Sequence, residues 1–116
     1  MASMIQVFGT KKCSDTNKAI RFFKERGVKF QFIDLNEKAI SKGELLSISR
    51  NNPIESLIDT EGKQFNSRNL KYMTYDLETE LLNDPLLFKT PITRLANESA
   101  IGVTPDKWKK WIEKIK

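Results

Sequence analysis

The chain has 116 residues, of which 39% are hydrophobic and 30% are charged, and its formal net charge is +5. A single cysteine excludes an internal disulfide and a cysteine-based zinc site, and the lack of histidine excludes Cys–His and Ser–His catalytic pairs. The chain contains no run of 18 apolar residues and does not open on a basic-then-apolar leader. We therefore expect one globular, cytoplasmic domain without a membrane partner.

The N-terminal third predicts a strand–helix–strand unit. Ile5–Phe8 has the apolar character of a short strand, and Phe30–Asp34 predicts a second, mostly buried strand. Between them, a helix ending at Arg26 places an apolar face at helical spacing, and Gly27 suits its C-terminal cap. The residues of this face are Thr16, Ala19, Ile20 and Phe23. Strands joined in this way should be parallel.

Residues 41–84 predict a small helical insert. Ser41 and Glu44 form a capping box in front of an apolar run, and Asn51–Pro53 ends that helix. The further elements expected here are a short helix over Ile54–Ile58, a turn over Thr60–Lys63, and a helix within Thr74–Asn83.

The C-terminal part returns to mixed structure. Pro91–Leu95 predicts a strand, Ala96–Ser99 a hairpin turn, and Ala100–Val103 the partner strand. Thr104 and Pro105 are typical of a helix start. The helix that follows carries an apolar stripe, which we expect to pack in the core: Trp108, Trp111, Ile112 and Ile115.

Cys13 stands where a reactive cysteine would be placed, between the first strand with its glycine loop and the first helix. A helix N-terminus carries partial positive charge and free N–H donors, and thiols there reach pKa values of about 3.5–7.5. Lys11 and Lys12 add positive charge nearby. The alternative is a buried structural thiol, but the neighbours from Lys11 to Thr16 are polar, which argues against burial.

The positive charge is concentrated at the two ends of the chain. Residues 1–29 and 104–116 are basic, whereas residues 30–103 carry more acidic than basic side chains. A positive surface could attract an anionic thiol, an oxyanion or nucleic acid. For the tail, a solvated lysine-rich helix face is the alternative.

The stretch Gly9–Ala19 resembles the opening motif of the ArsC/Spx/YffB family, and the resemblance extends over essentially the whole chain. Further matching segments are Gly27–Asp34, Leu57–Gly62, Lys89–Ile92 and Ala100–Val103. The resemblance implies an α/β, thioredoxin-like fold with a four-stranded mixed sheet in a single domain, 1–116. Its core would be 4–40 and 86–116, with 41–84 as the inserted helical subdomain. It also implies a cis Thr90–Pro91 bond, with Pro91 beside Cys13.

The chain departs from the family at positions that matter for chemistry. The arsenate reductases of this family hold the oxyanion with arginines, where this chain has Asp59, Thr90 and the stretch Ile101–Gly102. Bidentate arginine is an efficient way to hold a multiply charged oxyanion. Lys11, Lys12, Lys89 or Arg94 could compensate, but we expect weak or absent arsenate reduction. Spx-type regulators switch through Cys-x-x-Cys, and here the second position is Thr16, which cannot form a disulfide.

The resemblance therefore implies a monothiol, glutathione- or glutaredoxin-dependent reductase of arsenate reductase type, with glutaredoxin-like oxidoreductase chemistry. Cys13 would be the nucleophile, and glutathione or another low-molecular-weight thiol would resolve the adduct. Lys11, Lys12, Thr16, Thr90 and Pro91 would form the thiol-binding site. Glutaredoxin or thioredoxin is a possible partner; we expect a monomer with no bound cofactor or metal and no direct nucleic-acid contact. The alternative is an Spx-like regulator that binds RNA polymerase or another protein without catalysis.

Overall fold

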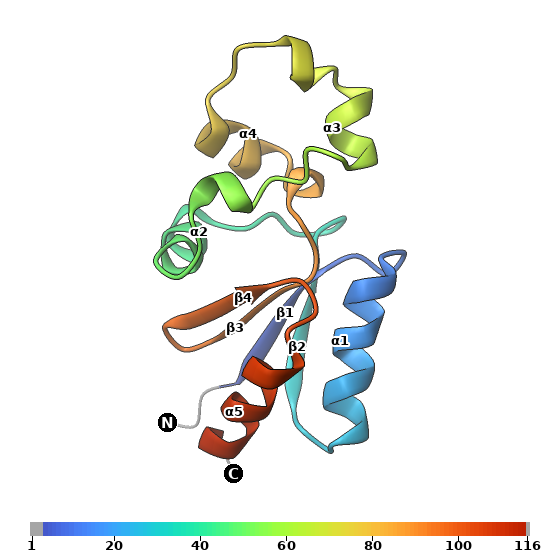
Figure 1. The fold of residues 1–116 in the computed structure, drawn as a ribbon, viewed down its shortest axis with the longest axis vertical. Helices are drawn as coiled ribbons and strands as arrows, with labels where there is room; N and C mark the ends of the chain where they lie inside the picture. Colours follow the sequence, from blue (N-terminus) through green and yellow to red (C-terminus); the bar gives the residue numbers. More distant parts are fainter. Residues whose placement is uncertain (1–3, 116) are drawn as a thin grey trace.

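A computed structural model describes residues 4–115; residues 1–3 and 116 of the expected domain lie outside the described residues. The described chain forms a sheet with one pair of helices on one face and a set of shorter helices on the other (Figure 1). None of the helices within 4–115 has the length and hydrophobicity needed to cross a bilayer.

The sheet has four strands in the order β2-β1-β3-β4. Their bounds are β1 Ile5–Gly9, β2 Phe30–Asp34, β3 Ile92–Leu95 and β4 Glu98–Ile101. β1 and β2 are parallel, as the strand–helix–strand pattern predicts, and the other two pairings are antiparallel. The sheet is therefore mixed, and β1, which leads to Cys13, lies in its interior.

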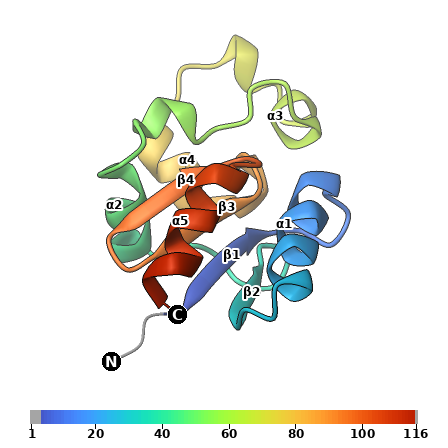
Figure 2. The ribbon, with the colours of Figure 1, turned by 60° about the horizontal axis from the view of Figure 1, so that its bottom comes forward.

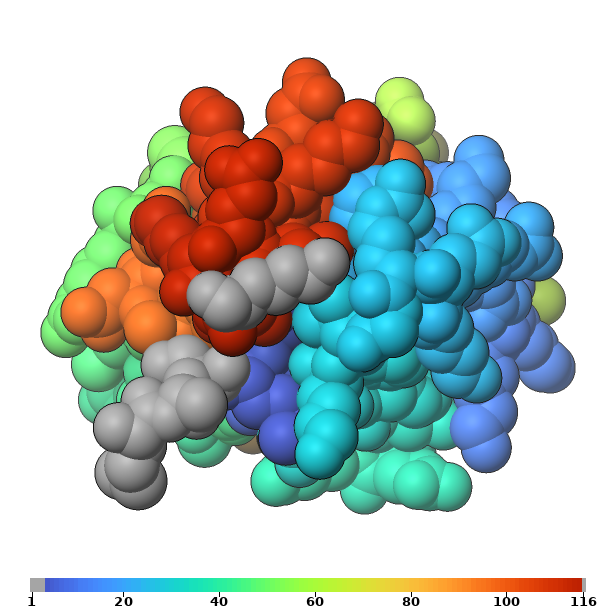
Figure 3. All heavy atoms as spheres, turned by 90° about the horizontal axis from the view of Figure 1, so that it is seen from below, coloured from blue at the N-terminus to red at the C-terminus, as the bar shows by residue number. Residues whose placement is uncertain are grey.

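Helices α1 (Ser14–Glu25) and α5 (Pro105–Ile115) cover one face of the sheet. Figure 2 shows α5 crossing in front of the strands, and Figure 3 shows α1 and α5 adjoining at the end of the molecule seen from below. The rings of Phe22 and Trp108 meet edge to face with centroids 5.1 Å apart. Trp108 is buried, and its indole N–H donates to Thr93 Oγ1 at 2.9 Å, so this large side chain is held by a hydrogen bond as well as by packing.

The opposite face packs against the helical segment between β2 and β3. Its elements are α2 Lys42–Ser49, η1 Ile54–Ser56, α3 Lys63–Ser67, η2 Leu70–Tyr72, α4 Leu77–Asn83 and η3 Pro85–Leu87. The predicted capping box is present, with Ser41 Oγ accepting from the Glu44 N–H at 3.2 Å. Buried Leu45, Leu57 and Leu81 join Phe8 and Ile92 of the sheet in one apolar cluster.

A buried polar contact joins this helical segment to the edge of the sheet. Ser99 in β4 is fully buried, and its Oγ lies 3.1 Å from the Ile48 carbonyl, to which it donates. The same oxygen accepts from Asn52 Nδ2 at 2.9 Å. The end of α2 is therefore held to β4 by hydrogen bonds as well as by apolar packing.

Three expectations about the strands and turns need correction. β2 is an edge strand, and only Ile33 of its five residues is buried, so the prediction of a mostly buried strand was wrong. The hairpin turn consists of Ala96 and Asn97 alone, and β4 begins at Glu98 rather than at Ala100. Ala96 adopts a left-handed φ of 53°, which permits a two-residue turn that the sequence pattern does not reveal.

The helical segment also differs in detail from the expectation. The short helix expected over Ile54–Ile58 is a 3-10 turn over Ile54–Ser56. Two short elements, α3 and η2, were not predicted, because stretches of five and three residues are too short to show a helical period.

Candidate functional site

Cys13 is the N-cap residue of α1, as its place in the sequence predicts. Its backbone N–H donates to the Thr10 carbonyl at 3.2 Å, and its own carbonyl accepts from Asn17 N at 3.1 Å. The side chain is partly exposed. The sulfur therefore stands at the positive end of a helix dipole, where first-turn N–H groups are free to face an anion.

Glycine at position 9 lets the first turn of α1 approach β1 closely. A Cβ there would stand 2.3 Å from Thr16 Oγ1, far inside van der Waals contact. Thr16 itself is fully buried directly beneath the cysteine turn. Position 9 is therefore glycine because any larger residue would clash with Thr16.

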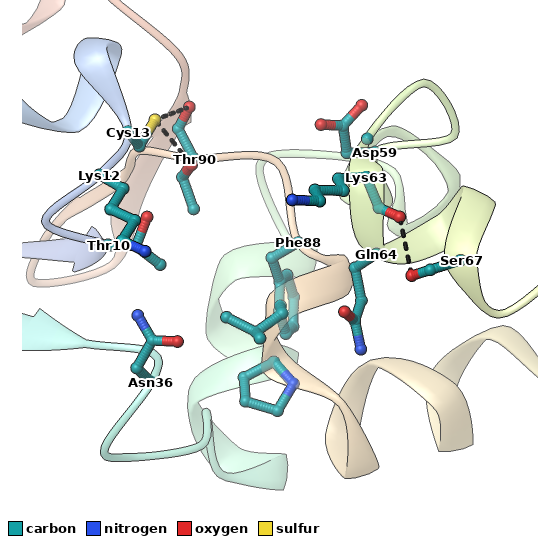
Figure 4. A pocket seen from close by; sticks show the side chains of 13 residues that line it. Thr10, Lys12, Cys13, Asn36, Asp59, Lys63, Gln64, Ser67, Phe88 and Thr90 are labelled. Carbon is teal, nitrogen blue, oxygen red and sulfur yellow. Dashed lines mark hydrogen bonds between the residues drawn. The ribbon is translucent and has the colours of Figure 1, made fainter.

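Thr90 lies against the sulfur, although it is 77 residues away in sequence. Its hydroxyl donates to Cys13 Sγ at 3.0 Å, and Sγ lies 3.8 Å from the Thr90 carbonyl (Figure 4). The Thr90–Pro91 peptide bond is cis, as the family resemblance implies. The segment leading into β3 therefore contributes a hydrogen-bond donor to the thiol.

Two opposing influences set the pKa of Cys13. Partial burial raises it, because the charged thiolate loses hydration. The Thr16 and Thr90 hydroxyls and the backbone N–H groups of Thr16 and Asp15 lower it, and together they outweigh the burial. In the geometry drawn, Thr16 Oγ1 is buried and has no hydrogen-bond partner within the described part of the chain. The Thr16 hydroxyl hydrogen can therefore rotate toward the sulfur and donate to it when the thiolate forms.

A cavity of about 530 Å³ opens beside Cys13 (Figure 4). One wall comes from the sheet side of the molecule and the other from the helical segment. The lining residues are Thr10, Lys12, Cys13, Asn36, Asp59, Gly62, Lys63, Gln64, Ser67, Pro85, Leu86, Phe88 and Thr90. Its volume is within the range of about 300–1,000 Å³ typical of small-molecule sites.

Three charged side chains line this cavity: Lys12, Asp59 and Lys63. The ion pairs found within residues 4–115 involve none of the three. Asp59 Oδ1 accepts from the Glu61 N–H at 3.2 Å. In the view of Figure 4, the side chains of Asp59 and Lys63 point from the helical segment toward the Cys13 side of the cavity. The cavity thus offers charges of both signs to a ligand.

The predicted site residues take different positions. Cys13, Lys12 and Thr90 line the cavity. Thr16 and Pro91 are buried next to the site without lining it, and Lys11 is exposed outside the lining. Lys89 and Arg94, considered as substitutes for the family arginines, are not part of the lining either.

Several lining residues were not predicted, among them Asn36, Lys63, Gln64 and Phe88. They come from separate segments, and only the fold brings them together. For Lys63, the sequence offered one signal, the turn predicted over Thr60–Lys63, but nothing in that turn indicated that it faces Cys13. Within residues 4–115, no group of three or more His, Cys, Asp or Glu side chains is arranged to hold a metal ion.

Comparison with known proteins places this geometry in a fold. The family Glutaredoxin matches residues 5–54. The chain has the thioredoxin-like fold. Its structural neighbours are mostly arsenate reductase-like proteins of the ArsC type, and a search of curated proteins found no match.

Three solved structures illustrate this thioredoxin-like relationship. The YffB protein is 20% identical, with 92% of this chain and 97% of that chain covered and a TM-score of 0.79. An arsenate reductase from Vibrio cholerae is 18% identical (95% and 98% covered, TM-score 0.77). An arsenate reductase (ArsC) related protein from Brucella melitensis is also 18% identical (94% and 94% covered, TM-score 0.66). At these identities the likeness shows the fold.

Proposed function

We propose that the chain is a thiol-dependent oxidoreductase of the arsenate reductase-like type, with Cys13 as its nucleophile. The observation that supports this best is the environment of the sulfur. Cys13 caps α1, accepts a hydrogen bond from Thr90 and has a lowered pKa, and it opens into the cavity. A partly exposed, low-pKa thiol is the condition for nucleophilic reactivity.

The proposed reaction is thiol–disulfide exchange in two steps. The Cys13 thiolate attacks one sulfur of a disulfide; the S–S bond breaks, a Cys13–S–S–R bond forms, and the second sulfur leaves as a thiolate. A thiol from solution then attacks the mixed disulfide on the sulfur of R. This regenerates the Cys13 thiolate, which the Thr90 hydroxyl and the helix N-terminus again stabilise, and releases a new disulfide.

The resolving thiol has to come from another molecule, because Cys13 is the only cysteine in the chain. Glutathione or a similar small thiol is the proposed co-substrate, and glutaredoxin or thioredoxin a proposed protein reductant. Such chemistry suits a monomer in the reducing cytoplasm, where thiols are abundant. The proposal needs no resident cofactor.

The proposal is tested by intact-mass analysis and by turnover. The protein, incubated with oxidised glutathione, should gain one glutathionyl adduct that disappears with reduced glutathione. With hydroxyethyl disulfide as substrate, it should accelerate the consumption of glutathione, and Cys13→Ser should abolish both effects. Cys13→Ser unfolding at the same temperature as the parent would serve as the control for folding. Absence of adduct and of turnover would contradict the enzyme and favour the Spx-like, partner-binding alternative, including RNA polymerase.

A further inference from the structure

The charged residues of the cavity indicate which kind of thiol enters it, if Cys13 acts as the proposed function requires. We propose that Asp59 and Lys63 recognise the amino-acid end of the thiol substrate. Asp59 would pair with its ammonium group and Lys63 with its carboxylate, while its sulfur meets Cys13. The substrates would then be thiols and disulfides that carry an amino-acid headgroup, with cystine and oxidised glutathione as examples.

The position of the two residues supports this pairing. Asp59 and Lys63 flank one turn of the helical segment, and both line the cavity that contains Cys13. Both point toward the Cys13 side in Figure 4, and neither is engaged in an ion pair within residues 4–115. Two opposite charges that line one cavity and are not paired with each other match the two charges of an amino-acid headgroup.

The local backbone holds the Asp59 carboxylate in place. Its Oδ1 accepts from the Glu61 N–H at 3.2 Å, which leaves Oδ2 without a hydrogen bond in the described residues. A Cβ at position 62 would stand 2.7 Å from Oδ2, so Gly62 provides the space in which this oxygen lies. The carboxylate is therefore anchored by one oxygen and available through the other.

The charges also fit the chemistry of such a ligand. An ammonium group offers three N–H donors and no acceptor, and the Asp59 carboxylate supplies both an acceptor and the opposite charge. Lys12 supplies a second cation in the same cavity, which suits a peptide thiol with one ammonium and two carboxylates. An inorganic oxyanion has no cationic group, and the Asp59 charge would oppose its entry.

The test compares four small disulfides that differ in charge: cystine (zwitterionic), cystamine (dicationic), dithiodipropionate (dianionic) and hydroxyethyl disulfide (neutral). Second-order rate constants for mixed-disulfide formation at Cys13 are measured by intact mass and divided by the rate for the neutral disulfide. These ratios remove differences in the intrinsic reactivity of Cys13, and dividing them by the same ratios for free glutathione removes the differences among the leaving thiols. We expect the parent protein to favour cystine over the neutral disulfide by about tenfold, an interaction of about 1.4 kcal/mol.

Two variants assign the roles. Asp59→Asn keeps an oxygen that can accept from the Glu61 N–H but removes the charge; it should lower the cystamine ratio about three- to tenfold and raise the dithiodipropionate ratio. Lys63→Gln should raise the cystamine ratio and lower the dithiodipropionate ratio. Both variants should lower the cystine ratio. The matched controls are Glu55→Gln and Lys42→Gln, exposed charges of the helical segment outside the cavity lining, which should leave all ratios unchanged.

The outcomes separate this inference from the function on which it rests. If Cys13 exchanges with the neutral disulfide but Asp59→Asn and Lys63→Gln leave the ratios as in the parent, the headgroup assignment is wrong and the oxidoreductase stands. Equal changes in the two control variants would likewise overturn it, since they would show a general effect of net charge. If Cys13 exchanges with none of the four disulfides, both proposals fall.

Discussion

At Cys13, hydrogen bonds replace the charged partners that many reactive thiols have. The chain has no histidine, and no lysine is among the groups that lower the pKa of Cys13. Donors from Thr90, Thr16 and the first turn of α1 lower the pKa, against the partial burial that raises it. Neutral donors act at short range, so the protonation state of the thiol depends on the positions of the Thr16 and Thr90 hydroxyl groups.

Alkylation of Cys13 should depend on pH. Because the pKa of Cys13 is lowered, its rate of reaction with iodoacetamide should rise through an inflection below the ordinary cysteine value of about 8.5 and level off above it. The thiolate is lost as the pH falls through this lowered pKa, so reactivity decreases on the acidic side. An inflection at or above 8.5 would contradict an activated thiol.

Removing the Thr90 hydroxyl should raise that inflection. Thr90→Val keeps the shape of the side chain but removes the donor 3.0 Å from the sulfur. A net contribution of about 1 kcal/mol for one hydrogen bond corresponds to about fivefold slower alkylation near neutral pH. Thr60→Val, an exposed threonine outside the lining of this cavity, is the matched control. Identical pH profiles for Thr90→Val and the parent would show that the hydroxyl does not stabilise the thiolate.

Arsenate should be a poor substrate. Asp59 lines the cavity where the resembled enzymes have an arginine, and Thr90 donates to the sulfur where another would stand. Loss of one charge-assisted contact in a reaction centre costs on the order of 10²-fold in rate. A steady-state assay with arsenate, glutathione and glutaredoxin measures the rate of arsenate reduction. Robust turnover that Cys13→Ser abolishes would show that Lys12 and Lys63 have taken the place of the arginines.

At the scale of elements, helices with explicit end signals were the ones the sequence predicted best. Ser41 and Glu44 predicted the start of α2, and Thr104 with Pro105 predicted that of α5. The turn at Ala96 and the elements α3 and η2 were missed or misplaced, because they depend on backbone geometry and tertiary packing rather than on periodicity. The cavity lining includes Lys63, Gln64 and Ser67 of the unpredicted α3, so the site was less predictable than the fold.

The capping box of α2 should make a measurable contribution to stability. Ser41→Ala removes the acceptor for the Glu44 N–H and should lower the free energy of unfolding by about 1 kcal/mol. Urea unfolding followed by circular dichroism measures the change. Ser47→Ala, inside the same helix, is the control and should be neutral or slightly stabilising, because alanine favours helix interiors. Equal midpoints for Ser41→Ala and the parent would mean that α2 does not depend on its cap.

For the whole molecule, the cavity lies between the loops at one end of the sheet and the helical segment that packs on one of its faces. One wall is formed by the loop from β1 to α1, by Asn36 after β2 and by Thr90 before β3, and the other belongs to the helical segment. The contact of Ser99 with the Ile48 carbonyl and Asn52 is one of the joints that hold these parts together. The resemblance predicted the overall arrangement, but this joint is formed by residues with no pattern in the sequence.

Ser99→Ala should therefore destabilise the whole fold. It removes the buried hydroxyl that donates to the Ile48 carbonyl and accepts from the half-buried Asn52 amide, two hydrogen bonds that contribute about 1 kcal/mol each. Thermal unfolding should shift to lower temperature as a single transition, because both clusters share the sheet. Ser49→Ala, whose hydroxyl bonds only within α2, is the control. An unchanged transition in Ser99→Ala would show that apolar packing alone sets the position of the helical segment.

The lone cysteine has a practical consequence for finding the physiological partner. Oxidoreductases with two cysteines release a captured molecule by their own second thiol, so their partners are trapped only after that thiol has been mutated. This chain has no such internal release, and under the proposed mechanism its adduct persists until another molecule supplies a thiol. The adduct of the unmodified protein is therefore lost only through external thiols, which acid inactivates by protonation. Rapid acid quenching of cells should preserve whatever Cys13 carries, and fragment masses would identify it directly.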